Sequence, residues 1–429
     1  MTTKMINRTA APDLQIPETV SLGAYRQLTL GNGVPVYIAD NNTEDVVKIE
    51  LCFPAGRWYE PSPMLSRAVC RLLTKGTSRF SSKELADRIE FYGASVETAN
   101  GQDYTSVKIF SLGKYLPEIM PLVGEMLQDA SMPPEELQLF QKKQLQKLQV
   151  GLRNTDFVAN RTMHAALFGD QHPYGYAVDA DMIRALDTTS MRNFSRQHYQ
   201  PGLATVFLSG NLTDATIQEL ERSVGSQTAE PITGAHQRSL HSAEEQQILV
   251  PNAESVQSSI RIASLTIGKD HPDYAPLNVA NTVLGGYFGS RLMSNIREDK
   301  GYTYGIYSLI RHHHNGSYFV IDTEVGNEVC RAAVDEIYAE MKQLAEVPVD
   351  NNELTVVRNY MLGSLIRATD GSFNRIQVIR NMVMSGLDFE YFDRLVTAVQ
   401  RTRPEQIQEL AGKYLDPTKQ KEIICGQPI

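Results

Sequence analysis

Few side chains in this sequence of 429 residues stand in patterns that could do chemistry. His312-His313-His314 could ligate a metal through imidazole nitrogens. Cys70, between Arg67 and Arg71, could act as a nucleophile, because nearby cations lower the pKa of a thiol. Both patterns have a simpler interpretation. Successive strand residues point to opposite faces, so the histidine run is more typical of a partly exposed strand end. Cys70 has no histidine nearby in sequence to act as a base, which favours a packed helix cysteine.

A further histidine, His241, stands three residues before Glu244-Glu245, a spacing that resembles half of a zinc-binding motif. The segment around it, 225–247, is rich in Gly, Ser, Thr, Pro, Gln and charged residues, which is typical of a linker. We therefore interpret His241 as solvated. Trp58 and the aromatic residues around Tyr59 indicate packing in a core or between domains.

The composition argues against several classes of protein. There are 50 acidic and 41 basic side chains, a formal net charge of −9, and no basic block, so we expect neither nucleic acid nor a membrane surface as partner. The longest apolar stretches, such as 203–209, have the length of a strand. The opening MTTKMINRTAAPDLQIPE has no apolar signal region, and the cysteines are far apart. We therefore expect a cytoplasmic protein with reduced, mostly buried thiols.

The order of the expected elements repeats along the chain. Each half is predicted to contain a strand, two helices, a pair of strands and two more helices. In the first half these are 46–56, 65–75, 82–92, 93–101, 103–112, 116–128 and a helix that begins at Pro133. In the second half they are 258–268, 274–284, 290–300, 302–310, 316–325, 328–344 and 347–367.

The centres of the matching strands, Ile49 and Ile262, are 213 positions apart (262 − 49). A unit repeated at this offset predicts two homologous α+β domains, each a mainly antiparallel sheet covered by helices. We place the first domain at 1–224, the linker at 225–247 and the second domain at 248–429. Three unrelated α/β domains are the alternative, and the parallel order of so many elements argues against it.

Several local motifs in this layout resemble the M16 (pitrilysin/insulinase) family of zinc metallopeptidases, in particular its short two-domain members. The resemblance covers about residues 25 to 425, and it depends on the order and spacing of the motifs together. They are Lys75-Gly76-Thr77, Gly93-Ala94-Ser95, His172-Pro173-Tyr174-Gly175, Tyr199-Gln200-Pro201, Gly210-Asn211-Leu212, Gly285-Gly286, Ser290-Arg291-Leu292 and the run R-E-D-K-G-Y-T-Y at 297–304.

Active members of that family carry H-x-x-E-H on the helix before the Lys-Gly-Thr-like segment. Two histidines one turn apart hold the zinc, and the glutamate activates its bound water. At these positions the present chain has Arg67, Cys70 and Arg71 in place of His, Glu and His. A guanidinium stays protonated and repels Zn²⁺. Neither H-x-x-E-H nor H-E-x-x-H occurs anywhere in the chain.

The family's third zinc ligand is a glutamate on the helix that begins here at Pro133. After Glu136 this helix continues through 137–149 without a carboxylate. We therefore expect that this chain binds no metal and has no catalytic residue in its first domain. The strand 95–99 is at the family's substrate-edge position, but it reads Val-Glu-Thr-Ala where active members usually have Asn-Ala. This departure also fits a first domain that no longer binds the scissile segment.

The second half retains what the resemblance identifies as substrate-binding residues, Arg297 and Tyr304. In active members the matching residues reach across the cleft, where a guanidinium can hold substrate carbonyls and a phenol can donate to a developing oxyanion. Alternatively, Arg297 is a cation at a helix C-terminus and Tyr304 is a strand aromatic.

The resemblance implies a division of labour between two similar chains. We expect a subunit that is inactive alone and that supplies Arg297 and Tyr304 to the zinc site of a homologous partner carrying H-x-x-E-H. The substrate would be an extended peptide added to a sheet edge, with acidic walls mildly favouring basic peptides. Two alternatives remain: a structural scaffold with no peptidase role, and a self-sufficient hydrolase built around Cys70.

Overall fold

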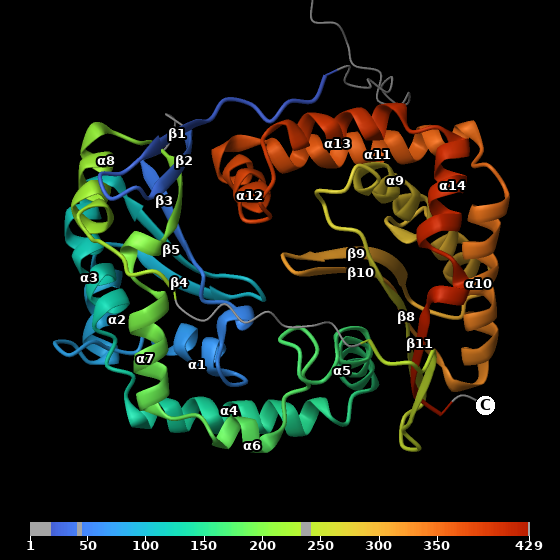
Figure 1. Ribbon diagram of the computed structural model, residues 1–429, viewed down its shortest axis with the longest axis horizontal. Coiled ribbons are helices and arrows are strands. Elements are labelled where there is room, and N and C mark those ends of the chain that lie inside the picture. The colour runs from blue at the N-terminus through green and yellow to red at the C-terminus, as the bar shows by residue number, and fades with distance from the viewer. Residues whose placement is uncertain (1–18, 41–44, 233–241, 428–429) are drawn as a thin grey trace, which may run out of the picture.

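Each half of the chain forms one β-sheet with helices on its outer face (Figure 1). The computed structural model describes residues 19–40, 45–232 and 242–427. Most of the first half lies on the left of Figure 1 and most of the second half on the right, so the two predicted α+β units lie side by side. The fold class expected from the sequence is confirmed.

The first sheet has the strand order β1-β2-β6-β3-β5-β4, so β4 is a free edge. Its strands, in chain order, are β1 (Arg26–Thr29), β2 (Pro35–Asp40), β3 (Val46–Phe53), β4 (Ser95–Asn100), β5 (Thr105–Leu112) and β6 (Thr205–Gly210). Only β2 and β6 pair in parallel.

The second sheet repeats this order as β7-β11-β8-β10-β9, without a counterpart of β1. Its strands are β7 (Gln247–Pro251), β8 (Gln257–Thr266), β9 (Ile306–His313), β10 (Gly316–Gly326) and β11 (Lys421–Gly426). Again a single pair, β7 with β11, is parallel. Ile49 pairs with Ile109, and Ile262 pairs with Ile321, so the predicted repeat aligns the two sheets strand by strand.

The α-helices divide between the two halves of the chain. Those of the first half are α1 (Leu65–Leu72), α2 (Ser82–Phe91), α3 (Leu116–Gln128), α4 (Pro134–Gly151), α5 (Thr155–Phe168), α6 (Ala180–Arg184), α7 (Thr188–His198) and α8 (Asp214–Leu220). Those of the second half are α9 (Tyr274–Gly285), α10 (Cys330–Glu346), α11 (Asn351–Thr369), α12 (Gly371–Val383), α13 (Glu390–Arg401) and α14 (Pro404–Tyr414).

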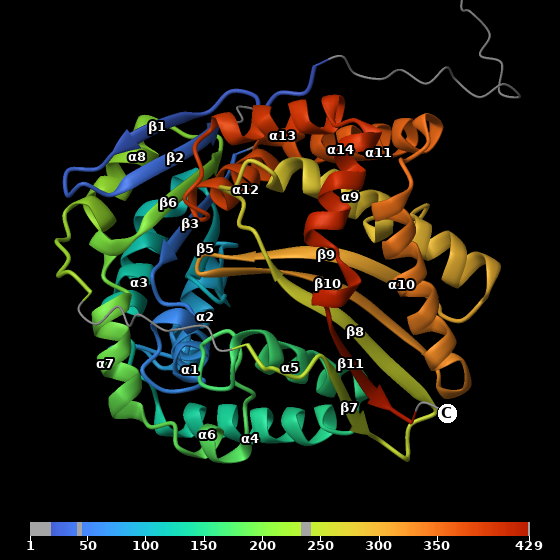
Figure 2. The same ribbon diagram turned by 45° about the vertical axis from the view of Figure 1, so that its right-hand side comes forward.

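One helix of each half packs on the sheet of the other half. Helix α5 packs on β8 and β11, and helix α12 packs on β2 and β6 (Figures 1 and 2). Strand β3 shows why both faces of the first sheet are buried. Val47, Ile49 and Leu51 enter the core of the first half, whereas Cys52 belongs to the core that is built mainly by the second half. The two halves are therefore interlocked by exchanged helices.

Several elements differ in their bounds or helix type from the sequence-based expectation. The helix predicted at 65–75 ends at Leu72, and the strand predicted at 302–310 begins only at Ile306. The helix predicted at 290–300 is mainly a π-helix, Met293–Asp299. Helix α2 begins as its sequence suggested, although its cap is Ser81, whose side chain accepts from Glu84 N while the Glu84 carboxylate accepts from Ser81 N.

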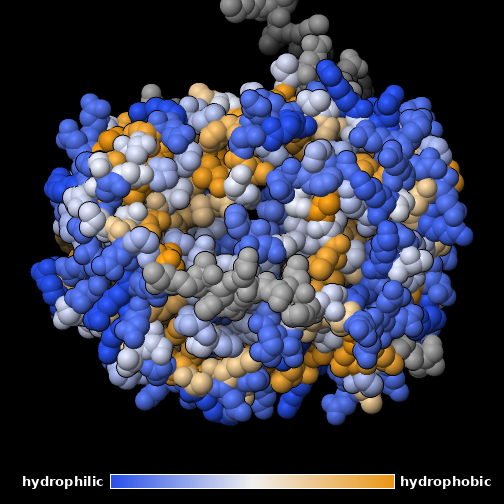
Figure 3. All heavy atoms as spheres, in the orientation of Figure 1, coloured by the Kyte–Doolittle hydropathy of each residue, from blue (hydrophilic) through white to orange (hydrophobic). Residues whose placement is uncertain are grey.

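The predicted linker begins where a short π-helix, Glu221–Gly225, ends, and it stops where β7 begins at Gln247. Its described residues, 226–232 and 242–246, form no helix or strand. In the described ranges, no helix is both long and apolar enough to cross a membrane. Hydrophilic residues cover most of the face in Figure 3, and the hydrophobic residues there form separate groups.

Candidate functional site

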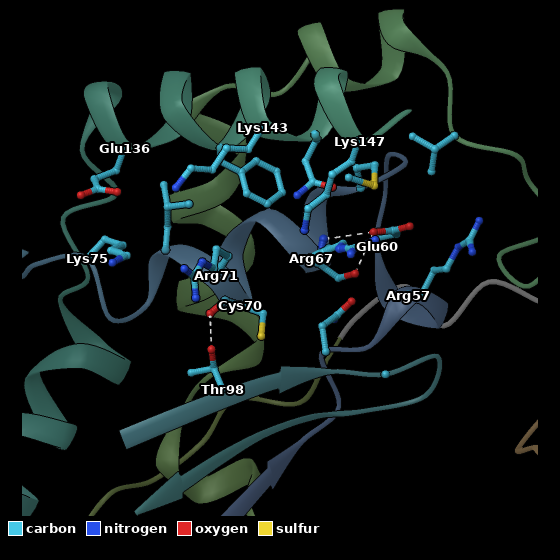
Figure 4. Close-up of a pocket in the computed structure, with 18 of the residues that line it drawn as sticks. Arg57, Glu60, Arg67, Cys70, Arg71, Lys75, Thr98, Glu136, Lys143 and Lys147 are labelled. Carbon is cyan, nitrogen blue, oxygen red and sulfur yellow. Dashed lines mark hydrogen bonds between the residues drawn. The ribbon is translucent and has the colours of Figure 1, made fainter. Parts of the chain in front are cut away.

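Helix α1 carries the three residues that stand at the zinc-motif positions. Arg67 and Arg71, one helical turn apart, both line a cavity of about 950 Å³ (Figure 4). Cys70 also lines this cavity, but it is only 4% exposed and its carbonyl oxygen accepts a hydrogen bond from the Thr98 hydroxyl at 2.9 Å. All three residues therefore lie on one helix, beside one cavity.

A buried carboxylate fixes the start of α1. Glu60 accepts hydrogen bonds from Ser66 N at 3.0 Å and from Ser66 Oγ at 2.8 Å, so it pairs one backbone amide of the first turn. The Tyr176 hydroxyl also donates to Glu60, and it accepts from Met64 N at 3.0 Å. Burial raises the pKa of Glu60. Met64 has a φ of +69°, which is unusual for a residue with a side chain.

The opposite wall of the cavity is α4, and it presents cations to α1. Lys143 and Lys147, one turn apart, line the cavity together with Gln144, and Glu136 lies at the far end of the helix (Figure 4). A tetrahedral zinc site needs imidazole, thiolate or carboxylate donors in one place. In the described part of the chain, no group of three or more His, Cys, Asp or Glu side chains could hold a metal ion. The residues here do not fit zinc.

The charge of this cavity is opposite to the acidic wall expected from the net charge. Six cations line the cavity, against the two carboxylates Glu60 and Glu136: Arg57, Arg67, Arg71, Lys75, Lys143 and Lys147. The acidic walls were expected for a chamber between two subunits, and that expectation stays a prediction. The whole-chain charge of −9 is an average, and it does not describe one local surface.

Cys70 does not have the environment of a nucleophile. Burial raises the pKa of its thiol to about 11, and this effect outweighs the nearby Arg71 and Arg67. All four cysteines, Cys52, Cys70, Cys330 and Cys425, are buried and free. The interpretation of Cys70 as a packed helix residue is confirmed, and its environment removes the physical basis of a hydrolase centred on it.

The three consecutive histidines lie at the end of β9 and in the turn that follows. His312 and His313 are half-buried and His314 is exposed, as expected for a partly exposed strand end. His313 packs on Tyr174 with ring centroids 4.7 Å apart, so this run joins the β9–β10 hairpin to the first half. Trp58 packs on Tyr174 in the same cluster, which confirms its predicted packing role. His241 lies outside the described residues.

Arg297 lies in the last turn of the π-helix, the position that the alternative interpretation assigned to it. Its guanidinium stacks over the ring of Phe288 at 4.5 Å from the centroid. Among the residues that the structure describes, no carboxylate pairs with Arg297, and Phe288 itself is more than half exposed. The guanidinium is therefore held by stacking, and its hydrogen-bond donors remain available.

Tyr304 is not a strand residue. It lies in the loop before β9, and its side chain is 93% exposed. The neighbouring Thr303 fastens this loop, because its hydroxyl bonds to Gly305 O at 3.0 Å and to Glu324 O at 2.8 Å. Tyr302 N donates to Ile296 O at 3.0 Å, which ties the loop to the π-helix that carries Arg297.

Sequence reasoning missed the residues that complete both sites. Lys143 and Lys147 lie in the stretch 137–149, which was singled out only because it lacks carboxylates. Their spacing of four on a helix places both on one face. Nothing in the sequence indicated the roles of Phe288 and Thr303. Phe288 stacks on Arg297, and Thr303 fixes the loop of Tyr304. Their roles depend on contacts that form only in the folded chain.

These features define a protein class: a two-unit peptidase-like fold with cations at the positions of the zinc motif, and with a half-buried Arg297 and an exposed Tyr304 in the second unit. Two family models match the chain. The model described as "Insulinase (Peptidase family M16)" matches residues 36–176, and the model described as "Peptidase M16 inactive domain" matches residues 185–361. Together they cover most of the sequence, so the chain belongs to the M16 family.

Some similar proteins are named as zinc proteases and others as homologues without peptidase activity. The "Uncharacterized zinc protease YmxG" of Bacillus subtilis is 22% identical over 82% of this chain and 86% of its own length. The "Non-peptidase homolog YmxG" of Helicobacter pylori is 21% identical over 89% of both chains. A solved structure of a peptidase M16 inactive domain from Pseudomonas fluorescens superposes with a TM-score of 0.85. It has 21% identity and covers 94% of this chain and 98% of its own, which shows a shared fold.

Proposed function

We propose that this chain is the non-catalytic subunit of a two-chain M16 peptidase. In this proposal a homologous partner carries H-x-x-E-H and the zinc, and the present chain supplies Arg297 and Tyr304 to that active site. The observation that carries the proposal is the exposure of Tyr304. The phenol is 93% exposed on a fastened loop and has no hydrogen bond to any described residue, which supports a role outside its own chain.

The chemistry of the two side chains supports a role at a peptide. Arg297 keeps its donors free while Phe288 limits its rotation, so it can bind substrate carbonyls at a smaller entropic cost. Tyr304 can donate a hydrogen bond to the oxyanion that forms when the partner's zinc-bound water attacks. The substrate in this proposal is an extended peptide held between the two subunits.

A structural role without proteolysis is the second candidate. The cationic residues at the zinc positions and the name of the Helicobacter pylori relative, a non-peptidase homolog, favour it. In that case the exposed aromatic residues near Arg297 serve assembly alone. The first candidate predicts peptidase activity in the assembled pair, and the second predicts none.

Reconstitution separates these candidates. The purified chain is mixed with the H-x-x-E-H homologue from the same organism, and hydrolysis of a fluorogenic peptide library is measured together with complex formation. We expect a stable complex with activity that neither chain has alone. A complex with no gain in activity supports the scaffold, and the absence of a complex contradicts both candidates.

A further inference from the structure

The cavity beside α1 carries a positive charge that the proposed function does not use. Arg67 and Arg71 follow each other by one turn on α1, and Lys143 and Lys147 do so on α4. Like charges at this spacing destabilise a helix. In the described ranges, no salt bridge links any of these four side chains, or Lys75, to a carboxylate. An anion bound between these side chains would offset this repulsion.

The cations are spread along the cavity and do not converge on one point. In Figure 4, Lys75 and Glu136 lie at one end and Arg57 lies at the other, with the arginines of α1 and the lysines of α4 between them. This distribution suits an elongated ligand with several negative charges. A compact phosphate is disfavoured at the start of α1, because Ser66 N already donates to Glu60 and Met64 N to the Tyr176 hydroxyl.

The floor of the cavity is the free edge of the first sheet. Within the described residues, strand β4 pairs with β5 alone, from Ser95 opposite Phe110 to Asn100 opposite Thr105, so its other edge has unpaired backbone groups. Thr98 and Asn100, two positions apart on β4, both line the cavity. An extended peptide can therefore add to this edge and run beneath α1 and α4.

The spacing of the cations matches an extended chain. Residues one helical turn apart are separated by about 6 Å along a helix, and alternate residues of a strand by about 6.6 Å. Carboxylates on alternate residues of an added strand would thus meet successive cations. Leu139 and Phe140 also line the cavity, and they offer apolar contacts between the charges.

We propose that this cavity binds an acidic peptide segment, extended along β4, whose carboxylates are held by Arg67 and Arg71 on one side and by Lys143 and Lys147 on the other. The segment is bound and not cut, since the site lacks metal ligands and the Cys70 thiol is buried. The site lies in the first half, whereas the proposed function uses Arg297 and Tyr304 of the second half, so each can fail without the other.

Fluorescence anisotropy on the full chain alone tests this site. The probe is a labelled octapeptide of alternating Glu and Leu, compared with the same peptide containing Lys for Glu and with a version N-methylated at alternate residues. Two double variants remove cavity charges: Arg67→Gln with Arg71→Gln, and Lys143→Gln with Lys147→Gln. A matched control removes two exposed charges outside the cavity, Lys142→Gln with Arg153→Gln.

We expect each cavity variant to weaken binding of the acidic peptide about tenfold, because charge-assisted hydrogen bonds are lost, and the control to change it less than about twofold. N-methylation should weaken binding by a similar factor, and the Lys peptide should not bind. The proposal is overturned if the control weakens binding equally or if the Lys peptide binds as well. It is also overturned if tripolyphosphate displaces the probe while N-methylation has no effect, which would indicate a phosphate site.

Discussion

Arg380 on α12 forms an ion pair with Glu50 on β3, which lies in the opposite half of the chain. The Arg380 Nη1 atom is 2.6 Å from Glu50 Oε1, and Glu50 is only 1% exposed. Burial alone would raise the pKa of Glu50, but Arg380 and Lys48 lower it below its usual value. The second sheet has a similar pair, because Arg261 on β8 contacts Asp156 on α5. Each exchanged helix is thus attached to the opposite sheet by a charged contact.

Removing Arg380 should loosen the exchanged helix. Arg380→Gln leaves the buried Glu50 carboxylate without its closest cation, and we expect the free energy of unfolding to fall by about 3 kcal/mol. Urea denaturation followed by circular dichroism measures this change. The control is Arg401→Gln on α13, where an exposed arginine forms no ion pair in the described part of the chain. Equal losses in both variants would show that the Arg380–Glu50 pair does not stabilise the fold.

Acidification should weaken the contact between the halves through His164. This side chain of α5 lies 3.1 Å from the Tyr318 hydroxyl, and burial lowers its pKa to about 4. The unfolded chain binds the proton at about pH 6.5, so stability is fully present above that pH and falls as the pH drops toward 4. We expect a loss of up to about 2 kcal/mol from this group, allowing for its partial exposure.

Urea midpoints measured between pH 7 and pH 4 follow this loss. His164→Phe should make the decline shallower, although burial also lowers the pKa of His312 to about 4 and keeps part of the slope. His271→Gln, which removes an exposed imidazole, is the control. A His164→Phe slope identical to that of the wild type contradicts the assignment.

The wild-type chain should contain far less than one zinc per molecule by elemental analysis, because guanidiniums stand at the ligand positions. Changing Arg67→His, Cys70→Glu and Arg71→His together restores the motif on α1 but leaves Lys147 opposite it. Adding Lys147→Glu should therefore raise zinc affinity further. One tightly bound zinc in the wild type would overturn the account of the first half.

Cys70 should react slowly and should not be needed for function. With its pKa raised to about 11, only about 0.1% of the thiol is ionised at pH 8. Ellman's reagent should modify the folded chain slowly and the urea-unfolded chain at once. Cys70→Ala should leave the activity of a reconstituted pair unchanged. Rapid labelling of one thiol, or loss of activity in this variant, would support the hydrolase alternative.

Much of the fold followed from the sequence because the apolar patterns repeat. Strand β3 and its counterpart β8 were both recognisable as buried runs, and the offset between Ile49 and Ile262 is that of the two observed sheets. The exchange of α5 and α12 could not be predicted, because an apolar helix face does not say which of two similar sheets it covers.

The features of the candidate sites were likewise predictable only in part. The loss of the zinc motif is a matter of residue identity, so Arg67 and Arg71 were sufficient to predict it. The exposure of Tyr304 was not predictable, because its aromatic neighbours in the sequence looked like a strand. The hydrogen bond of Thr303 to Glu324, which fastens the loop before that strand, is a tertiary contact.

The kinetics of the reconstituted pair test the central claim most directly. Tyr304→Phe removes one hydroxyl from an exposed loop, and we expect kcat to fall about 100-fold with complex formation unchanged, as for other lost oxyanion donors. Arg297→Ala should lower kcat/KM without changing assembly. Tyr25→Phe and Arg401→Ala, at exposed positions elsewhere, are the matched controls. If Tyr304→Phe and Arg297→Ala pairs cleave peptide at the wild-type rate, this chain does not complete its partner's active site.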